Sequence, residues 1–101
     1  MICLIRAKLR PDADVPAYEA LNARMEELVR AMPGFIGVNG YASPDGDEFG
    51  LVRFETREAL RAWREHPEHL AAQQRGRTEF YASLAIEVCE VIRAYEFTHS
   101  P

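Results

Sequence analysis

The chain has 101 residues, 48% of them hydrophobic and 28% charged, with a formal net charge of -4. This length predicts a single domain, residues 1–101, with one modest core. The apolar runs are far shorter than the roughly 20 residues that span a bilayer, and no block of basic residues offers a surface to nucleic acid. We therefore expect neither a membrane nor a nucleic acid as partner, and favour a small molecule or another protein.

The chain begins with an alternating pattern that is typical of a strand, residues Ile2 to Leu9. Because no basic segment followed by a long apolar stretch precedes this strand, we expect a cytoplasmic protein without a leader. The two cysteines, Cys3 and Cys89, stand among apolar neighbours in predicted strands. Their placement indicates reduced, buried thiols and not a secreted disulfide framework.

A helix is predicted from Val15 to Met32. Asp14 is a plausible N-cap, Pro16 is tolerated in the first turn, and Pro33-Gly34 ends the helix. Apolar residues at three- and four-residue steps form its inward stripe. These residues are Tyr18, Leu21, Met25, Leu28, Val29 and Met32.

A hairpin and a second helical region follow. Residues Phe35 to Ser43 and Glu48 to Glu55 alternate as strands, joined by the turn signal Pro44-Asp45-Gly46-Asp47. Thr56 is then expected to cap a helix that runs through Trp63.

The second helical region is expected to break at His66-Pro67, because a residue before proline is disfavoured in the helical conformation. Pro67 suits the first position of a new helical turn, so we predict a further helix from Pro67 to Arg75 at a changed angle. Gly76 should end or kink it.

The last strand is predicted from Ala85 to Phe97, after residues Thr78 to Ser83, which fit either a helix or a strand. Its alternation is apolar on both faces, with Ile86, Val88 and Ile92 on one and Cys89, Val91, Tyr95 and Phe97 on the other. Two helices cannot cover both faces, so we expect a second copy of the sheet to cover one of them in an obligate homodimer. The element order predicts an α+β, ferredoxin-like βαββαβ domain with an antiparallel four-stranded sheet.

The stretch from Trp63 to His69 concentrates the chemically reactive side chains. A histidine exchanges protons near neutral pH, so His66 or His69 is a candidate general base, and Trp63 is a candidate wall of an apolar pocket. The alternatives are structural. Trp63 would fill the core, His66 would cap the helix that begins at Pro67, and His69 would be solvated.

Two histidines three residues apart also raise the possibility of a metal ion, with Glu65 or Glu68 as an oxygen ligand. The proline between the histidines prevents one helical turn from presenting both in parallel, so we expect no metal site.

Other chemistry has less support in the sequence. Asn39 and Arg53 are polar residues of the predicted hairpin that could donate to an anionic or phenolic ligand, or lie at a rim and form interface ion pairs. The chain contains no glycine-rich phosphate loop, no GxSxG motif and no CxxC pair. Nucleotide binding, serine hydrolysis and dithiol redox chemistry are therefore not indicated.

Several of these segments together resemble the antibiotic biosynthesis monooxygenase domain family over nearly the whole chain. They are the Pro33-Gly34-Phe35 junction, the stretch from Trp63 to His69, the run from Ala72 to Tyr81 and the strand around Val88-Cys89-Glu90-Val91. The resemblance implies a dimeric α+β barrel with a cavity between helices and sheet in each subunit. It also implies a helix-borne tryptophan at Trp63 and a nearby histidine at His66 or His69.

The family includes cofactor-free quinol monooxygenases, haem-degrading enzymes and members without known activity, so the resemblance indicates the fold more specifically than the function. The haem-degrading branch has an asparagine on the first strand, and Ile2 to Leu9 contains none.

The leading hypothesis is a homodimeric, cofactor-independent monooxygenase that acts on a small aromatic or quinol-type molecule. His66 or His69 would be the base, and Asn39 and Arg53 would stabilise the phenolate. The expected pocket walls are Trp63, Phe80 and Tyr81. The alternatives are a non-enzymatic dimeric module for small-ligand binding or stress response, and a haem-binding or haem-degrading protein with one histidine as the axial ligand.

Overall fold

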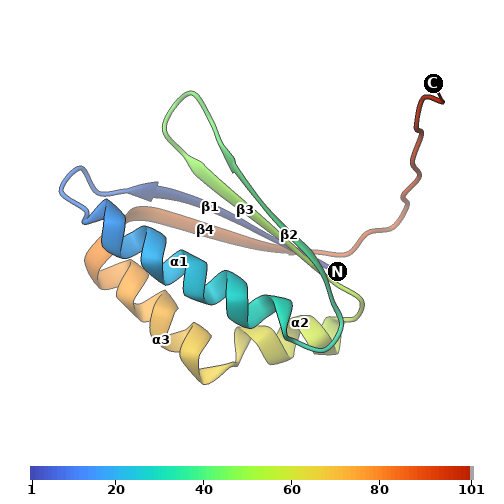
Figure 1. Cartoon of the computed structure of the whole chain (residues 1–101), viewed down its shortest axis with the longest axis horizontal. Coiled ribbons are helices and arrows are strands. Elements are labelled where there is room, and N and C mark those ends of the chain that lie inside the picture. The colour runs from blue at the N-terminus through green and yellow to red at the C-terminus, as the bar shows by residue number, and fades with distance from the viewer. Residues whose placement is uncertain (101) are drawn as a thin grey trace.

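The computed structural model describes residues 1–100 and places four antiparallel strands in one sheet with helices against one of its faces (Figure 1). The elements in chain order are β1 (Ile2–Leu9), α1 (Val15–Arg30), β2 (Phe35–Ala42), β3 (Glu48–Phe54), α2 (Arg57–Arg64), α3 (Pro67–Arg75), a π-helical turn (Gly76–Phe80) and β4 (Tyr81–Cys89). The strand order is β2-β3-β1-β4. This arrangement confirms the predicted ferredoxin-like fold, with the second helical region divided into α2 and α3.

The helix boundaries follow the capping residues predicted from the sequence. The Asp14 side chain accepts a hydrogen bond from the Ala17 amide at 3.1 Å, and the Thr56 hydroxyl accepts one from the Ala59 amide at 3.0 Å. Between α1 and β2, Gly34 has a φ of +78°, and a Cβ atom there would lie 2.7 Å from the Ala59 Cβ. Only glycine satisfies both constraints, so the chain turns tightly into β2 at this point.

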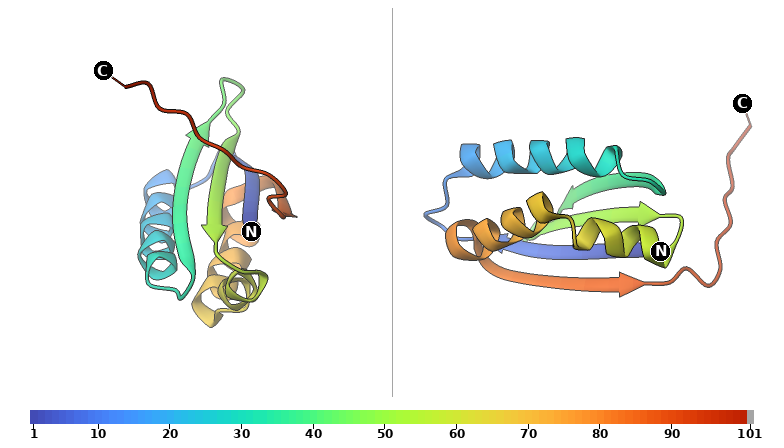
Figure 2. Two further views of the ribbon diagram at one scale, coloured as in Figure 1. Left: turned by 90° about the vertical axis from the view of Figure 1, so that its right-hand side faces the viewer. Right: turned by 90° about the horizontal axis from the view of Figure 1, so that it is seen from below.

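The core lies between the sheet and the helices. Phe54 and Leu60 are fully buried there, and Trp63 of α2 is 5% exposed. Cys3 faces the same layer, since it pairs directly with Val52 on β3 and paired residues point to the same side of a sheet. Helices cover only this face (Figure 2).

The other face of the sheet, which we call the open face, has no covering layer in the single chain (Figure 2). Ile2 and Leu4 of β1 alternate with the core residues and therefore point to it, as does Leu51, the partner of Leu4 on β3. Phe49 and Tyr41 pair with each other and extend the same apolar surface, on which Tyr41 is 62% exposed.

The last strand differs from the prediction at both ends, since it runs from Tyr81 to Cys89. It ends early because Cys89 pairs with Ile2, the first residue of β1, so that Glu90 has no strand beside it. Residues 90–100 extend away from the sheet without helix or strand (Figure 1). The predicted strand residues Ile92, Tyr95 and Phe97 consequently lie outside the sheet, with 93%, 82% and 88% of their surface exposed.

Because β4 is shorter than predicted, it contributes less apolar surface to the open face than its sequence pattern indicated. Val88 lies on the helix-facing side, because it pairs with Cys3, whereas Ala85 and Glu87 point to the open face. Cys89 is exposed and not buried as predicted. The apolar residues of the open face belong mainly to β1 and β3. Over residues 1–100, none of the helices is long and apolar enough to cross a membrane.

Candidate active site

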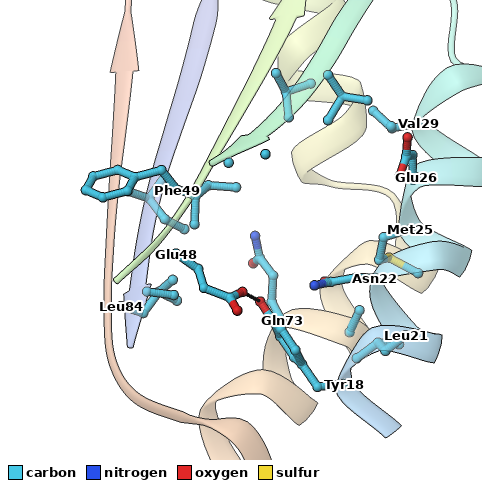
Figure 3. A pocket seen from close by; sticks show the side chains of 18 of the residues that line it. Tyr18, Leu21, Asn22, Met25, Glu26, Val29, Glu48, Phe49, Gln73 and Leu84 are labelled. Atoms are coloured by element: carbon cyan, nitrogen blue, oxygen red, sulfur yellow. Dashed lines mark hydrogen bonds between the residues drawn. The ribbon is translucent and has the colours of Figure 1, made fainter. Parts of the chain in front are cut away.

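A cavity of about 540 Å³ lies between the sheet and helices α1 and α3 (Figure 3). Most of its wall is apolar. The apolar lining includes Ile5, Leu21, Met25, Val38, Leu84 and Ile86. A space of this size and composition is typical of sites for small organic ligands, whose apolar walls exclude water while a few polar groups fix the orientation.

Polar groups gather at one end of the cavity. The Tyr18 hydroxyl of α1 donates a hydrogen bond to a Glu48 carboxylate oxygen of β3 at 3.0 Å. The side-chain amides of Asn22 and Gln73 enter the same space from α1 and α3 (Figure 3). An amide both donates and accepts, so these two residues could bind a hydroxyl or a phenolate oxygen.

The Tyr81 side chain also lies at this polar end, because the neighbouring Gly76 leaves room for its ring. A Cβ atom at Gly76 would lie 2.4 Å from the Tyr81 ring, so the ring occupies a place that any larger residue would take. Burial raises the pKa of Tyr81 and of Tyr18, whose ring centroids are 5.8 Å apart. Both phenols therefore keep their protons near neutral pH and remain hydrogen-bond donors.

Trp63 and His69 form a stacked pair on the wall of the cavity. Their ring centroids are 4.1 Å apart and the rings are inclined by 15°. The Nδ1 atom of His69 lies 3.0 Å from the Trp63 carbonyl oxygen. Since a carbonyl oxygen can only accept, Nδ1 carries the hydrogen in this contact.

The environment of His69 favours the neutral imidazole. Burial lowers its pKa below the ordinary value of 6.5, although the hydrogen bond to the Trp63 carbonyl acts in the opposite direction. In the neutral ring with a proton on Nδ1, the Nε2 atom has a free lone pair. His69 is therefore in the protonation state that a general base requires near neutral pH.

His66 has a different position. Its Nδ1 atom accepts a hydrogen bond from the Glu68 amide at 3.1 Å, so it serves as the N-cap of α3. His66 does not line the cavity, whereas His69 does. The sequence left the choice between these histidines open, and the structure brings only His69 to the cavity.

The structure also separates the other candidate residues. Trp63 and Tyr81 line the cavity, whereas Phe80 is 2% exposed and packs against Tyr18 in the core. Asn39 contributes to the cavity wall, but it pairs with Leu51, and this register directs its side chain to the open face. Arg53 pairs with Ile2 and is exposed on that same face.

Asn22, Gln73 and Glu48 were not among the candidates from the sequence. Asn22 lies four residues after Tyr18, and Gln73 lies four residues after His69, so each shares a helix face with a residue of the cavity wall. A polar residue within an apolar stripe was the signal that could have identified Asn22.

Over residues 1–100, no cluster of three or more His, Cys, Asp or Glu side chains could hold a metal ion.

Comparison with known proteins identifies the family. Residues 1–75 match the model of the family described as antibiotic biosynthesis monooxygenase. The chain belongs to the antibiotic biosynthesis monooxygenase family. A curated relative, the uncharacterized protein YqjZ of Bacillus subtilis, is 37% identical over 76 residues, which are 75% of this chain and 67% of that protein.

Solved structures support the same assignment of the fold. The Rv0793 protein of Mycobacterium tuberculosis is similar with a TM-score of 0.78 and 26% identity, over 93% of this chain and 97% of that one. A mutant of SnoaB from Streptomyces nogalater, a cofactor-independent oxygenase, has a TM-score of 0.78 at 14% identity, over 92% and 93% of the two chains. At this identity the similarity to SnoaB establishes the antibiotic biosynthesis monooxygenase fold alone.

Proposed function

We propose that the protein is a cofactor-independent monooxygenase that oxidises a small hydroxyarene of the quinol type. The observation that carries this proposal is the placement of His69 on the wall of a mainly apolar cavity, with its Nδ1 atom 3.0 Å from the Trp63 carbonyl oxygen and its pKa lowered by burial. Family membership and the fold shared with a cofactor-independent oxygenase support the same reaction class.

In this proposal His69 removes the phenolic proton through Nε2. The resulting phenolate is rich in electrons and transfers one electron to dioxygen, and the two radicals then combine to form a carbon–oxygen bond. The hydroperoxide loses its ring hydrogen and breaks its oxygen–oxygen bond. One oxygen atom stays as the new carbonyl of a quinone and the other leaves as water, so no external reductant is needed.

The other groups of the cavity would stabilise the phenolate and exclude water. We propose Asn22 and Gln73 as hydrogen-bond donors to its oxygen, in place of Asn39 and Arg53, whose positions in the sheet direct them to the open face. The Trp63 ring and the apolar wall would hold the aromatic ring of the substrate in a space of low polarity, where such hydrogen bonds are stronger than in water.

Oxygen uptake with a panel of hydroquinones and naphthoquinols, without added metal or flavin, tests this function. The His69→Gln variant should lose activity by about 10²- to 10⁴-fold, the range that a general base contributes. His66→Asn is the matched control, because asparagine preserves an N-cap acceptor for α3 and His66 lies outside the cavity lining. Ligand binding without oxygen uptake by any member of the panel would contradict the proposal and indicate a binding module.

We further propose that the protein is a homodimer in which the open faces of two sheets pack against each other. A monomer would leave the apolar surface of Ile2, Leu4 and Leu51 without a covering layer. The residues that line the candidate site place it on the opposite, helix-covered side of the sheet. Dimerisation through the open face would therefore cover this surface and leave the cavity accessible.

A further inference from the structure

A second hollow of about 760 Å³ lies on the other side of the Trp63–His69 pair, between helices α2 and α3 and strand β4. We call it the outer hollow. It shares six wall residues with the cavity: Ile5, Val52, Trp63, His69, Gln73 and Ile86. The stacked Trp63 and His69 rings therefore form part of the partition between the two spaces, and a ligand in the outer hollow can contact the candidate base.

The two spaces differ in charge. The ionisable lining of the cavity includes the carboxylates Glu26 and Glu48 and no lysine or arginine. The outer hollow has the opposite character, since its lining contains only one acidic residue, Glu65. Its four basic residues are Arg57, Arg61, Arg64 and Arg77.

Two of these arginines are available for a ligand. Arg61 pairs with Glu65 at 3.2 Å, and Arg57 lies 3.9 Å from Glu90. Arg64 and Arg77 form no ion pair within residues 1–100, and both are exposed at the hollow. A guanidinium group in this situation suits a carboxylate, which it can bind through two parallel hydrogen bonds.

The floor of the outer hollow is apolar. Leu70, Ile86 and Val88 remain 49%, 38% and 44% exposed there. An apolar floor next to unpaired cations is complementary to a molecule with an apolar body and one anionic group. A purely apolar ligand would leave the arginines unused, and a small inorganic anion would leave the floor uncovered.

We infer that the substrate is a hydroxyarene that carries a carboxylate. Its ring lies in the cavity against the Trp63–His69 pair, and its carboxylate extends past this pair to an unpaired arginine of the outer hollow, Arg64 or Arg77. The carboxylates of the cavity repel the anionic group, so the ligand is held in one orientation. This inference rests on the proposed function for the reaction, whereas the binding preference for a carboxylate can be measured without turnover.

Calorimetric titration of the full chain with two matched probes tests the preference. 3-Hydroxy-2-naphthoate carries the carboxylate and 2-naphthol lacks it. The wild type should bind the naphthoate at least about tenfold more tightly, the scale of a charge-assisted hydrogen bond. The double variant Arg64→Gln/Arg77→Gln should lose this difference and still bind 2-naphthol with unchanged affinity.

Arg93→Gln is the matched control, because it removes one positive charge from an exposed residue that lines neither space. It should leave both affinities unchanged, which separates a local contact from the overall charge. Equal affinity of the wild type for the two probes, no binding of either, or an unaltered naphthoate affinity in the double variant would overturn the inference. Oxygen uptake with neutral quinols would then still support the proposed function, and its absence despite tight naphthoate binding would contradict that function alone.

Discussion

His69 is the residue on which the proposed chemistry depends, and its protonation state is set by two neighbours that are fixed in the fold. The stacked Trp63 ring and the surrounding wall remove water from the imidazole, and the Trp63 carbonyl fixes the hydrogen on Nδ1. The backbone of α2 thus determines the tautomer, while the position of His69 on α3 places the ring at the cavity. The same indole is nearly buried and lines the cavity, so Trp63 serves both the core and the site.

The lowered pKa of His69 predicts how stability depends on pH. The unfolded chain binds the imidazole proton more tightly than the folded chain, so folding is favoured fully above about pH 6.5 and less as the pH falls through the folded pKa. In His69→Gln this contribution is absent. We therefore expect the melting temperature of the wild type to fall more than that of the variant between about pH 8 and pH 5. Parallel decreases in thermal unfolding of the two proteins would contradict the lowered pKa.

At the scale of the element, the π-helical turn after α3 determines where Tyr81 enters the site. Its first residue, Gly76, lies so close to the Tyr81 ring that an added methyl group must displace it. We expect Gly76→Ala to lower the free energy of unfolding by about 1 to 3 kcal/mol, the usual cost of overpacking. The displaced Tyr81 ring should also weaken binding of a phenolic ligand.

Gly40→Ala on β2 is the control for this substitution, because Gly40 does not lie on the open face and a Cβ atom there would meet only the Phe49 carbonyl oxygen, at an ordinary contact distance of 3.9 Å. Denaturant titration should show a change within about 0.5 kcal/mol for this variant. Equal stability of the two alanine variants would mean that the Tyr81 ring moves aside without cost, and would contradict the role given to Gly76.

Sequence patterns identified the elements whose signals are local. Asp14 and Thr56 cap the helices as predicted, and Pro67 begins α3 after the break at His66, because each depends on neighbouring residues only. The end of β4 depends instead on where its partner begins, so apolar alternation alone extended it too far, to Phe97.

The candidate site was likewise predictable only where its residues lie close together in the sequence. The short stretch from Trp63 to His69 indicated the stacked pair, while the donors opposite it come from α1 and from the end of α3. Their convergence depends on how the two helices lie across the sheet. For Arg53 the sequence left a ligand site and an interface open as alternatives, because alternation gives two faces without saying which one the helices cover.

At the scale of the whole molecule, the open face of the sheet predicts a dimer. Leu51→Asp would place a carboxylate in the proposed interface, where burial of an unpaired charge costs several kcal/mol, so we expect a monomer or aggregate. Light scattering coupled to size exclusion should give twice the chain mass for the wild type.

Val15→Asp is the matched control for Leu51→Asp, since Val15 is also apolar, is 44% exposed and begins α1 in the helical layer. This variant should remain a dimer. A Leu51→Asp protein that kept the dimer mass and the wild-type melting temperature would exclude the open face as the interface.

Trp63 lies where its fluorescence can report on the protonation of His69. It is the only tryptophan in the chain, so all indole fluorescence comes from the partition between the cavity and the outer hollow. An imidazolium stacked on an excited indole accepts an electron more readily than a neutral imidazole does. The fluorescence intensity should therefore decrease as His69 gains its proton. The tryptophan fluorescence of the unlabelled protein then reports whether the proposed base is in its neutral form.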